Sequence, residues 1–484
     1  MRPIRQARRR GAVGLMALLG MGMAVQASAE PWRVDPLRTL PPVLQQVDGA
    51  RAAAGASACE FDIVLPAPMS LSDAIARALC HHPETRQAWA WVQQEAAAVG
   101  VAQGAYLPNL SASASVARAE QRIDYSDQPG LSTDLGVRST RAGLRLTWVL
   151  YDFGLRAAHL AKARHLLNAA SAARNRDIQR ILLETAQAYY ALQSAQALLA
   201  AHRDAAALAR HSLEVAQARY QEGVGSLSDR LLAQTQLSDA RLREVQAQGE
   251  VRRATGRLAS VLALPPTSAF ELTAIDEDRT ARSEFRQAVE ELIETAQQAH
   301  PEIRVAQAQL AAAKSELDAV VAQGRPRISL VGTADRQDTP IERVSSRQVI
   351  ESFAVGVQLE IPLFSGFTNH YEKRRARAGV ERLESELADA RRRVALEVWE
   401  SYHTLATQAE TLEISAALTD DARKSFDVAQ GRYRAGVGSM LELLTAQNDV
   451  AQARQTYIAQ LAAWYDARIH LAAHVSRLES GAGM

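Results

Sequence analysis

The chain has 484 residues, of which 47% are hydrophobic, and its 55 basic and 54 acidic residues leave a formal net charge of +1. Because these charges are spread evenly and form no basic block, the sequence does not indicate a nucleic-acid-binding protein. It contains no P-loop, HExxH, GxSxG or CxxC motif, so we expect neither an enzyme nor a bound cofactor.

The N-terminal segment, 1–29, has the pattern of a secretory signal peptide. Several arginines precede an uncharged apolar run, Gly11 to Val25, and Ala27-Ser28-Ala29 supplies a small-residue cleavage site. An uncleaved membrane anchor is the alternative, but the run is short for the ~20 residues of a membrane helix. We therefore expect removal of the segment 1–29, an N-terminal periplasmic arm at 30–69, and no membrane-spanning helix beyond it.

Two cysteines, Cys59 and Cys80, lie near the start of the first predicted helix. In a chain bound for an oxidising compartment, the ordinary expectation is a structural disulfide between them. Their spacing does not match a metal site, and no other candidate ligands cluster nearby in the sequence. We expect a Cys59–Cys80 bond that ties the N-terminal arm to the first helix.

The chain contains two copies of one unit. The segment from Val215 to Ser226, VAQARYQEGVGS, recurs from Val428 to Ser439 as VAQGRYRAGVGS, and His82-Pro83-Glu84 recurs as His300-Pro301-Glu302. Matches of this length and order indicate a duplication. We place the domains at 1–29 (signal peptide), 30–69 (arm), 70–266 (first repeat), 267–281 (linker), 282–475 (second repeat) and 476–484 (tail).

Each copy begins with a helix followed by two strands. Leu71 to Tyr106 is rich in Ala, Gln and Glu and predicts a helix that ends before Pro108. Alternating apolar residues predict the strands, with Ala or polar residues between them. They are Leu110, Ala112, Ala114 and Val116, then Ala142, Leu144, Leu146 and Trp148 in the first copy; and Leu330 and Ala334, in a strand starting near Ile328, then Phe353, Val355, Val357, Leu359 and Ile361 in the second.

The predicted strands have dimensions and polarity that fit a membrane barrel. Each is close to the ~9–11 residues that cross a bilayer. One face is apolar and the other is largely polar, which suits lipid on one side and a water-filled lumen on the other.

Very long helices follow the strands. Leu155 to Glu222 contains no proline or glycine and predicts a helix of about 100 Å, and Phe367 to Ala435 matches it. Both end at Gly-Val-Gly turns, after which return helices begin at Leu227 and Met440. Since ordinary helices average about 11–12 residues, the pattern indicates a coiled-coil scaffold at the least.

Four strands cannot close a barrel alone, because about eight are the fewest that do. An open edge in hydrocarbon leaves backbone groups unpaired, at several kcal/mol each. Protomers must therefore share a barrel, of eight strands from two copies or twelve from three, and a lumen wide enough for solutes favours three.

Taken together and in order, these features resemble the outer membrane efflux protein family, the TolC-like channel-tunnels, over about residues 70–475. The motifs that carry the resemblance are Tyr106-Leu-Pro108, Tyr151-Asp-Phe-Gly154, Ile361-Pro-Leu-Phe-Ser-Gly366 and the paired Arg-Tyr-x-x-Gly-Val-Gly-Ser turns. The resemblance implies a mostly α fold with transmembrane β. In it a homotrimeric, twelve-stranded β-barrel in the bacterial outer membrane lipid continues into a long periplasmic α-helical barrel. It also implies two partners, a periplasmic adaptor (membrane fusion) protein and an inner-membrane transporter.

The resemblance further implies that the helix ends at the glycine turns close the periplasmic entrance. Glu442 takes one position of an acidic ring at the constriction, and Thr445 stands where a second aspartate is expected. Asp229 and Tyr433 match links between neighbouring coils. Because Gly438 replaces a family arginine, we expect the links to form through Arg432 or Arg434 instead. The adaptor is expected to contact the turns at Gly223, Gly225, Ser226, Gly436, Gly438 and Ser439.

Three alternatives stay open at this point. A soluble periplasmic coiled-coil adaptor would explain the helices, although it leaves the four strands without a purpose. His470 and His474, four residues apart on a helix, could bind a metal, but the sequence shows no third ligand, so we expect ordinary surface or core histidines. The cargo is expected to be a protein toxin exported by type I secretion. Drug or metal efflux stays open as the alternative, because the pump, rather than the channel, mostly selects the substrate.

Overall fold

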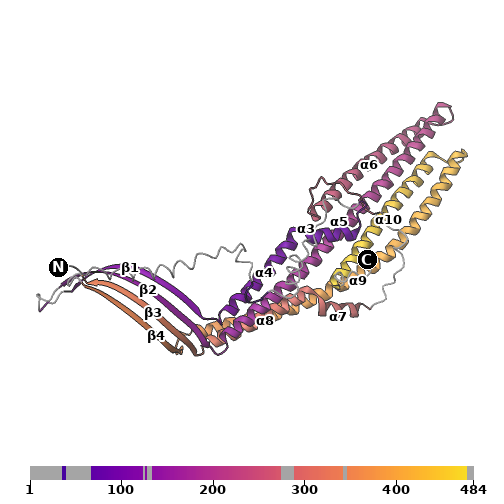
Figure 1. Ribbon diagram of the computed structural model, residues 1–484. Helices are drawn as coiled ribbons and strands as arrows, with labels where there is room; N and C mark the ends of the chain where they lie inside the picture. Colours follow the sequence, from indigo (N-terminus) through magenta and orange to yellow (C-terminus); the bar gives the residue numbers. More distant parts are fainter. Residues whose placement is uncertain are drawn as a thin grey trace, which may run out of the picture.

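The computed structural model describes residues 35–39, 67–123, 126–127, 133–273, 288–341 and 346–476. The molecule is long and thin: a curved sheet at one end continues into helices that end in two separate tips (Figure 1). The predicted signal peptide, most of the N-terminal arm with Cys59, residues 274–287 and the tail after residue 476 lie outside the described residues. Within the described part, no helix combines the length and apolarity that a bilayer crossing needs.

The two copies have the same element order, as the duplication predicts. The first copy consists of α3 (Leu71–His81), α4 (Pro83–Gly104), β1 (Asn109–Ile123), β2 (Thr133–Tyr151), α5 (Leu155–Gln221) and α6 (Leu227–Val261). The second consists of α7 (Val289–Ala299), α8 (Pro301–Gln323), β3 (Arg327–Ile341), β4 (Ser346–Glu360), α9 (Thr368–Arg434) and α10 (Met440–His474).

The single helix that we predicted from Leu71 to Tyr106 is wrong: it breaks into α3 and α4. Pro83 has no N–H to donate and stands at the first position of α4, while the His82 ring accepts the Glu84 N–H at Nδ1 (3.3 Å). The second copy repeats this break, with His300 accepting the Glu302 N–H at 3.3 Å. The duplicated His-Pro-Glu motif is therefore a helix start, with the histidine as the cap.

The glutamate of the same motif ties each helix start to a long helix. Glu84 forms an ion pair with Arg180 of α5, and Glu302 forms one with Arg393 of α9. The two arginines occupy equivalent positions in the two copies when the glycine turns are aligned. Since the side chains of these pairs are between about one third and one half exposed, we expect them to fix orientation more than to add stability.

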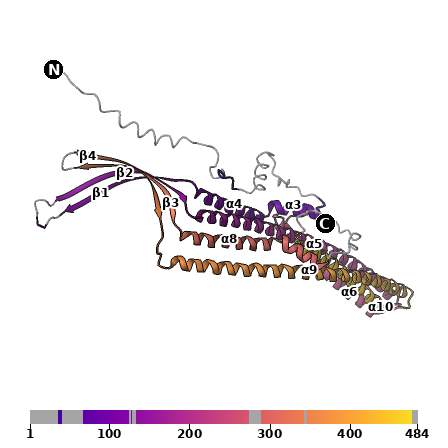
Figure 2. The same ribbon diagram turned by 90° about the horizontal axis from the view of Figure 1, so that it is seen from below.

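The four strands form one antiparallel sheet in the order β1-β2-β3-β4. Each strand continues into one helix, and α4, α5, α8 and α9 lie side by side in the same order as their strands (Figures 1 and 2). The sheet and the helical layer therefore form a single continuous wall, and within the described chain its outer strands are β1 and β4.

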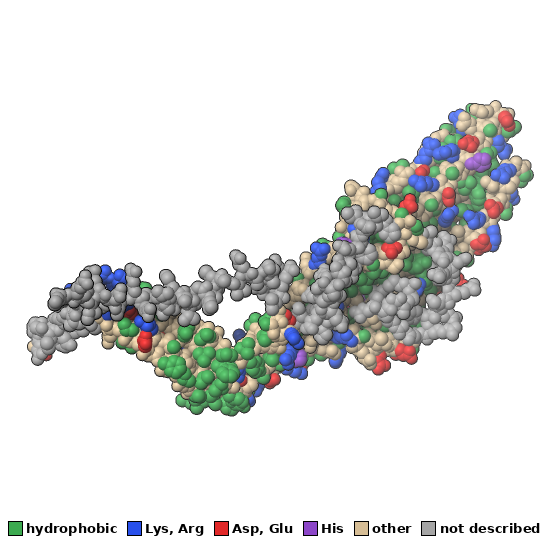
Figure 3. Space-filling view, in the orientation of Figure 1, with side chains coloured by type: hydrophobic (Ala, Val, Ile, Leu, Met, Phe, Trp, Pro, Cys, Tyr) green, Lys and Arg blue, Asp and Glu red, His purple; other side chains and the backbone are tan. Residues whose placement is uncertain are grey.

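The register places the predicted apolar residues on one face of the sheet. Partners on adjacent strands share a face, and these rows are Trp148–Leu330–Val357, Leu110–Leu146–Gly332–Val355 and Ala112–Leu144–Ala334–Phe353. Exposed hydrophobic side chains gather on the sheet near its junction with the helices (Figure 3). The alternation of polarity read from the sequence is confirmed.

The predicted strand lengths are too short. The strands have 15, 19, 15 and 15 residues, and Ile361, predicted as the end of the last strand, follows β4. Most of the extra residues on the apolar face are polar, and there Arg336 pairs with Glu351 at 2.7 Å. Backbone pairing does not require apolar side chains, so the ladder continues beyond the band that apolar alternation marks.

The helices α5 and α9 have 67 residues each. Helix α5 ends one residue before the end of its predicted range, and α9 is one residue shorter than predicted at both ends. Each folds back at its glycine turn onto a return helix of 35 residues, α6 or α10, giving two helical hairpins. Small side chains allow close packing: buried residues of α5 include Ala163, Ala170, Ala173, Ala186, Ala209 and Ala216. Near the tips, Ala216 and Ala233 of the first hairpin share a cluster with Phe426, Tyr433 and Met440 of the second.

Sheet polarity gives a first testable expectation. Arginine in place of Val357, in the apolar row, should cost about 2–4 kcal/mol of folding free energy in a bilayer, because the charge would face hydrocarbon. Arginine in place of the adjacent Gln358, on the opposite face, should be tolerated. Urea titration of the protein folded into lipid vesicles measures both, and equal losses would show that the assigned faces are wrong.

Candidate functional site

The candidate site is the pair of helical tips, and its first component is the duplicated turn. Gly223 and Gly436 follow the long helices with φ of +79° and +77°, a conformation that disfavours residues with a side chain. In the first turn, the N–H groups of Val224 and Gly225 both donate to the Arg219 carbonyl, at 3.0 and 2.9 Å. In the second, the equivalent bonds go to the Arg432 carbonyl. One carbonyl in the last turn of each long helix is thereby satisfied.

The second glycine of each turn is needed for close approach. A Cβ at Gly225 would lie 2.9 Å from the Arg219 Cβ, and one at Gly438 would lie 3.0 Å from the Arg432 Cβ. Any side chain at position 438, including the arginine that the resemblance led us to expect there, would therefore require this turn to move. Gly438 thus has a local reason of its own, independent of any contact with a partner.

Serine and an acidic residue open each return helix. The Ser226 hydroxyl accepts the Asp229 N–H at 3.0 Å, and the Ser439 hydroxyl accepts the Glu442 N–H at 3.1 Å. The acidic side chains stand in the first turn, where the helix dipole favours negative charge. The two turns therefore share the same backbone conformation and the same serine cap, and they differ in the contacts of their side chains.

Glu442 forms an ion pair with Arg432 across the second turn, with Glu442 Oε1 at 3.1 Å from Arg432 Nε. Both side chains are about half exposed. Thr445, one turn further along α10, lies on the same face, and both residues line a cavity of about 680 Å³ together with Lys424 and Asp449. The structure thus brings Glu442, Thr445 and Arg432 together, while Arg434 is exposed at the end of α9.

Tyr433 joins the two hairpins within one chain. Its side chain is 5% exposed, and the Arg219 guanidinium lies over its ring at 4.9 Å from the centroid. Arg219 Nη1 also donates to the Tyr433 carbonyl at 3.1 Å. Burial raises the pKa of Tyr433, Arg219 opposes this shift, and Asp229 adds to it, so Asp229 is close enough to act on the ring electrostatically.

Arg219 is a residue of this site that the sequence reasoning missed. It is the counterpart of Arg432 in the first copy of the Arg-Tyr-x-x-Gly-Val-Gly-Ser turn, so the repeat alignment contained the signal. The two arginines nevertheless have different partners: Arg432 bonds a carboxylate in its own hairpin, and Arg219 crosses to the other hairpin. The tips are therefore alike in backbone and unlike in polar contacts.

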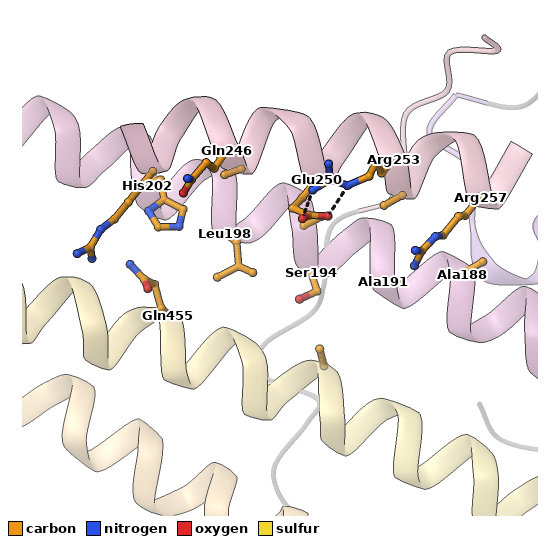
Figure 4. A pocket seen from close by; sticks show the side chains of 15 residues that line it. Ala188, Ala191, Ser194, Leu198, His202, Gln246, Glu250, Arg253, Arg257 and Gln455 are labelled. Atoms are coloured by element: carbon orange, nitrogen blue, oxygen red, sulfur yellow. Dashed lines mark hydrogen bonds and ion pairs between the residues drawn. The ribbon is translucent and has the colours of Figure 1, made fainter. Parts of the chain in front are cut away.

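A groove between the hairpins lies further from the tips. It encloses about 690 Å³ between α5 and α6 on one side and α10 on the other, where Gln455 faces His202 across the gap (Figure 4). Arg243, Arg253 and Arg257 make the wall formed by α6 strongly basic, with Glu250 paired to Arg253. Burial lowers the pKa of His202, with a contribution from Arg243.

The model of the "Outer membrane efflux protein" family matches twice, at residues 74–264 and 292–476, once for each copy. The chain belongs to the outer membrane efflux protein family. The double match independently supports the duplication.

Individual members of the family are similar over much of the chain. Protein CyaE of Bordetella pertussis is 34% identical over 456 residues, which cover 94% of this chain and 92% of the relative. The alkaline protease secretion protein AprF of Pseudomonas aeruginosa is 24% identical over 259 residues, 52% of this chain and 53% of AprF. Among solved structures, the outer membrane protein VceC of Vibrio cholerae superimposes with a TM-score of 0.72 at 18% identity, covering 84% of this chain and 95% of VceC.

These comparisons confirm the predicted fold and place. This outer membrane efflux protein has the TolC-like channel fold, with a four-stranded sheet and long helical hairpins in each chain. It is an export channel of the outer membrane that extends into the periplasm. The predicted Cys59–Cys80 bond stays a prediction, because Cys59 lies outside the described residues; Cys80 itself is not a free thiol.

The contact between Arg219 and Tyr433 can be tested by substitution. Tyr433→Ala should lower the free energy needed to separate the two hairpins locally at the tips by about 3 kcal/mol, because a buried aromatic ring and its cation–π contact are lost. Tyr433→Phe should retain most of it, since the ring and the backbone carbonyl remain. Hydrogen exchange of residues 428–447 reports this opening.

The duplication supplies the control. Tyr220, the counterpart of Tyr433, is 38% exposed and lies under Arg230 at 5.0 Å. Tyr220→Ala should therefore accelerate exchange much less. Equal acceleration by both alanine variants would contradict a special role for the contact between Arg219 and Tyr433.

Proposed function

We propose that this protein is the outer-membrane channel of a tripartite type I secretion system that exports a large protein. Its partners in the proposal are an inner-membrane transporter and a periplasmic adaptor protein, which docks on the Gly-Val-Gly-Ser turns. Support for a protein cargo comes from AprF, which is named for alkaline protease secretion, and from the resemblance of the sequence to the channel that exports the adenylate cyclase toxin. Drug or metal efflux is the competing cargo class.

The observation that carries the channel proposal is the open-edged sheet. β1 and β4 each have one edge that pairs with no strand of the described chain, and one face of the sheet is apolar. In hydrocarbon, such edges must pair with β4 and β1 of neighbouring copies. We infer a homotrimer with twelve strands, since four-stranded units from three copies give a lumen wider than eight strands would. The wall formed by α4, α5, α8 and α9 would then close into a tube beneath the barrel.

In such a trimer, three copies of each tip would meet around one axis. We propose that Glu442 of each chain lines the closed periplasmic constriction, with Thr445 one turn above it. The contact with Arg432 adds a feature to this proposal: each carboxylate already has a cation at 3.1 Å in its own chain. The ring is then partly neutralised in the closed state, and its affinity for cations depends on both residues.

A second role is proposed for the residues that link coils. Tyr433 and Arg219 hold the two hairpins of one chain together, and Asp229 acts on the same ring. We propose that opening moves the second hairpin away from the first by breaking this contact. An adaptor or transporter would favour opening by binding the turns more tightly in the open state.

The proposed constriction predicts opposite effects from the two members of its ion pair. Glu442→Ala should lower cation selectivity and weaken block by trivalent metal ions in planar bilayers. Arg432→Ala should strengthen both, because it leaves the three carboxylates unpaired. Stability should barely change, since half-exposed pairs contribute about 0–1 kcal/mol. Arg434→Ala, a neighbouring charge change away from the pair, is the control, and shifts of the same sign in Glu442→Ala and Arg432→Ala would sink the assignment.

The cargo class is tested in the native host. Deletion of this gene should remove a large protein from the culture medium and leave drug and metal tolerance unchanged, because the proposed pump serves protein export. Secretion should return with the wild-type gene on a plasmid. If tolerance to drugs or metals falls while the secreted proteins are unchanged, the channel serves efflux and the type I proposal is wrong.

A further inference from the structure

Three side chains that are far apart in the sequence meet in the second repeat. His300 stands at the junction of α7 and α8, Glu397 in the middle of α9, and His474 at the end of α10. Their ligand atoms all lie within 4.8 Å of one another, and His474 Nδ1 is 3.5 Å from Glu397 Oε2. His300 is 8% exposed, and the other two side chains are partly buried.

The hydrophobic core holds this cluster in place. Val394 and Val398 flank Glu397 on α9, and Leu471 and Val475 flank His474. All four are buried in one cluster that also includes Leu292 and Ile303, on either side of His300. Each of the three polar side chains therefore projects from a segment that is fixed by packing, which is the arrangement that a preorganised binding site needs.

The first repeat has the same scaffold without the cluster. His82 caps α4 as His300 caps α8, but Val261 takes the position of His474 at the end of the return helix. Glu184, the counterpart of Glu397, pairs with Arg180 instead. Since the first repeat folds in the same way, the three-residue cluster is not a requirement of the fold.

We propose that His300, Glu397 and His474 form a binding site for a divalent transition metal ion, with Zn²⁺ as the best-matched ion. Two imidazole nitrogens and one carboxylate oxygen are a ligand set that zinc accepts, with water in the fourth position. Bonds of about 2.0–2.2 Å would bring the ligand atoms to roughly 3.5 Å from one another. The His474 Nδ1–Glu397 Oε2 separation already has this value, and the ligand atoms of all three residues lie within 4.8 Å of one another, so His300 has to approach the other two by little more than about 1 Å. The ion would clasp the start of α8, the middle of α9 and the end of α10.

The charges around the cluster favour and oppose an ion in identifiable ways. The hydrogen bond with His474 lowers the pKa of Glu397 although burial opposes it, so Glu397 is a carboxylate near neutral pH. Burial lowers the pKa of His300, which leaves this imidazole neutral. Arg393, one turn before Glu397, opposes a cation, but its guanidinium is bound to Glu302 and Asp389.

His470 is adjacent to the cluster but has other partners. Its ring stacks near that of His474, with centroids 5.9 Å apart. Its Nε2 is 2.8 Å from Gln187 Nε2 and 3.6 Å from Asp466. The His470–His474 pair that is visible in the sequence is therefore divided: His474 faces the cluster, and His470 faces α5.

Metal binding replaces two polar contacts of the cluster. The first is the contact between His474 Nδ1 and Glu397 Oε2, and coordination at Nδ1 requires the proton of the neutral His474 ring to stand on Nε2. The second is the helix cap made by His300. His300 Nδ1 accepts the Glu302 N–H at 3.3 Å, so in the neutral ring the proton is on Nε2. Coordination at Nε2 moves that proton to Nδ1, and coordination at Nδ1 uses the same lone pair as the cap. In either case the Glu302 N–H must find water as its acceptor. No proton leaves the ring, and the lost bond is a long one.

The test uses the untagged full-length protein in detergent, stripped of metal with a chelator. We expect one Zn²⁺ per chain in calorimetric titration and Co²⁺ absorption bands of a low-coordinate site that includes nitrogen. His300→Asn, Glu397→Gln and His474→Asn should each weaken binding at least tenfold. Asparagine at position 300 is a good helix cap, so α8 stays intact in that variant.

Two control variants separate metal binding from structural effects. His82→Asn makes the same cap replacement in the first repeat, and His470→Asn changes the neighbouring histidine; both should leave Zn²⁺ affinity unchanged. Zn²⁺ should also raise the melting temperature of the wild type and not that of Glu397→Gln. If wild-type protein binds no Zn²⁺, or binds it equally after His474→Asn, the proposal fails and the cluster is a proton-binding ion pair only.

Discussion

Unpaired backbone at the edge of a sheet is the constraint on which the rest of this structure depends. In water, an edge strand hydrates its N–H and C=O groups, but in hydrocarbon each unsatisfied group costs several kcal/mol. The described chain supplies four strands with an apolar face and leaves the outer edges of β1 and β4 open. In a bilayer, a single copy therefore leaves the hydrogen bonds of two strand edges unmade. The assembly that pairs these edges also encloses the lumen.

The same constraint shapes the helices. Because each strand runs directly into one helix, the spacing and order of the strands are imposed on α4, α5, α8 and α9. Helices that must follow a closed wall can approach closely only where side chains are small, and alanine is frequent among the buried residues of α5. The return helices α6 and α10 then double the wall towards the tips, where the duplicated turns end both hairpins in one geometry and the unequal contacts of Arg219 and Arg432 make them differ.

Local patterns were predictable from the sequence because their physical causes are local. Alternation of apolar residues predicted the apolar face of the sheet, and the glycine and serine motifs predicted the two turns. Internal sequence repetition predicted the duplication that the family match then confirmed. Family resemblance, rather than residue physics, supplied the trimer and the candidate roles of Glu442 and Thr445. The helix break at Pro83 was overlooked because the surrounding Ala, Gln and Glu residues favour helix, and a proline at a first helical position leaves that composition unchanged.

Contacts between distant segments were not predictable in this way. Arg219 and Tyr433 are brought together by packing of one hairpin on the other, and no spacing rule connects them. His300 and Glu397 were likewise invisible as partners of His474, since a search for ligands along one helix finds only His470. The repeat helps after the fact, because it shows which contacts both copies share and which belong to one.

In the proposed assembly, β1 of one copy pairs with β4 of the next and three copies close one barrel. Native mass spectrometry of the detergent-solubilised protein, extracted from outer membranes without heating, tests this most directly. We expect one dominant species with three times the mass of the mature chain, which dissociates to single chains when boiled. A stable single chain or a species of two chains, extracted from the membrane in folded form, would contradict the twelve-stranded closure.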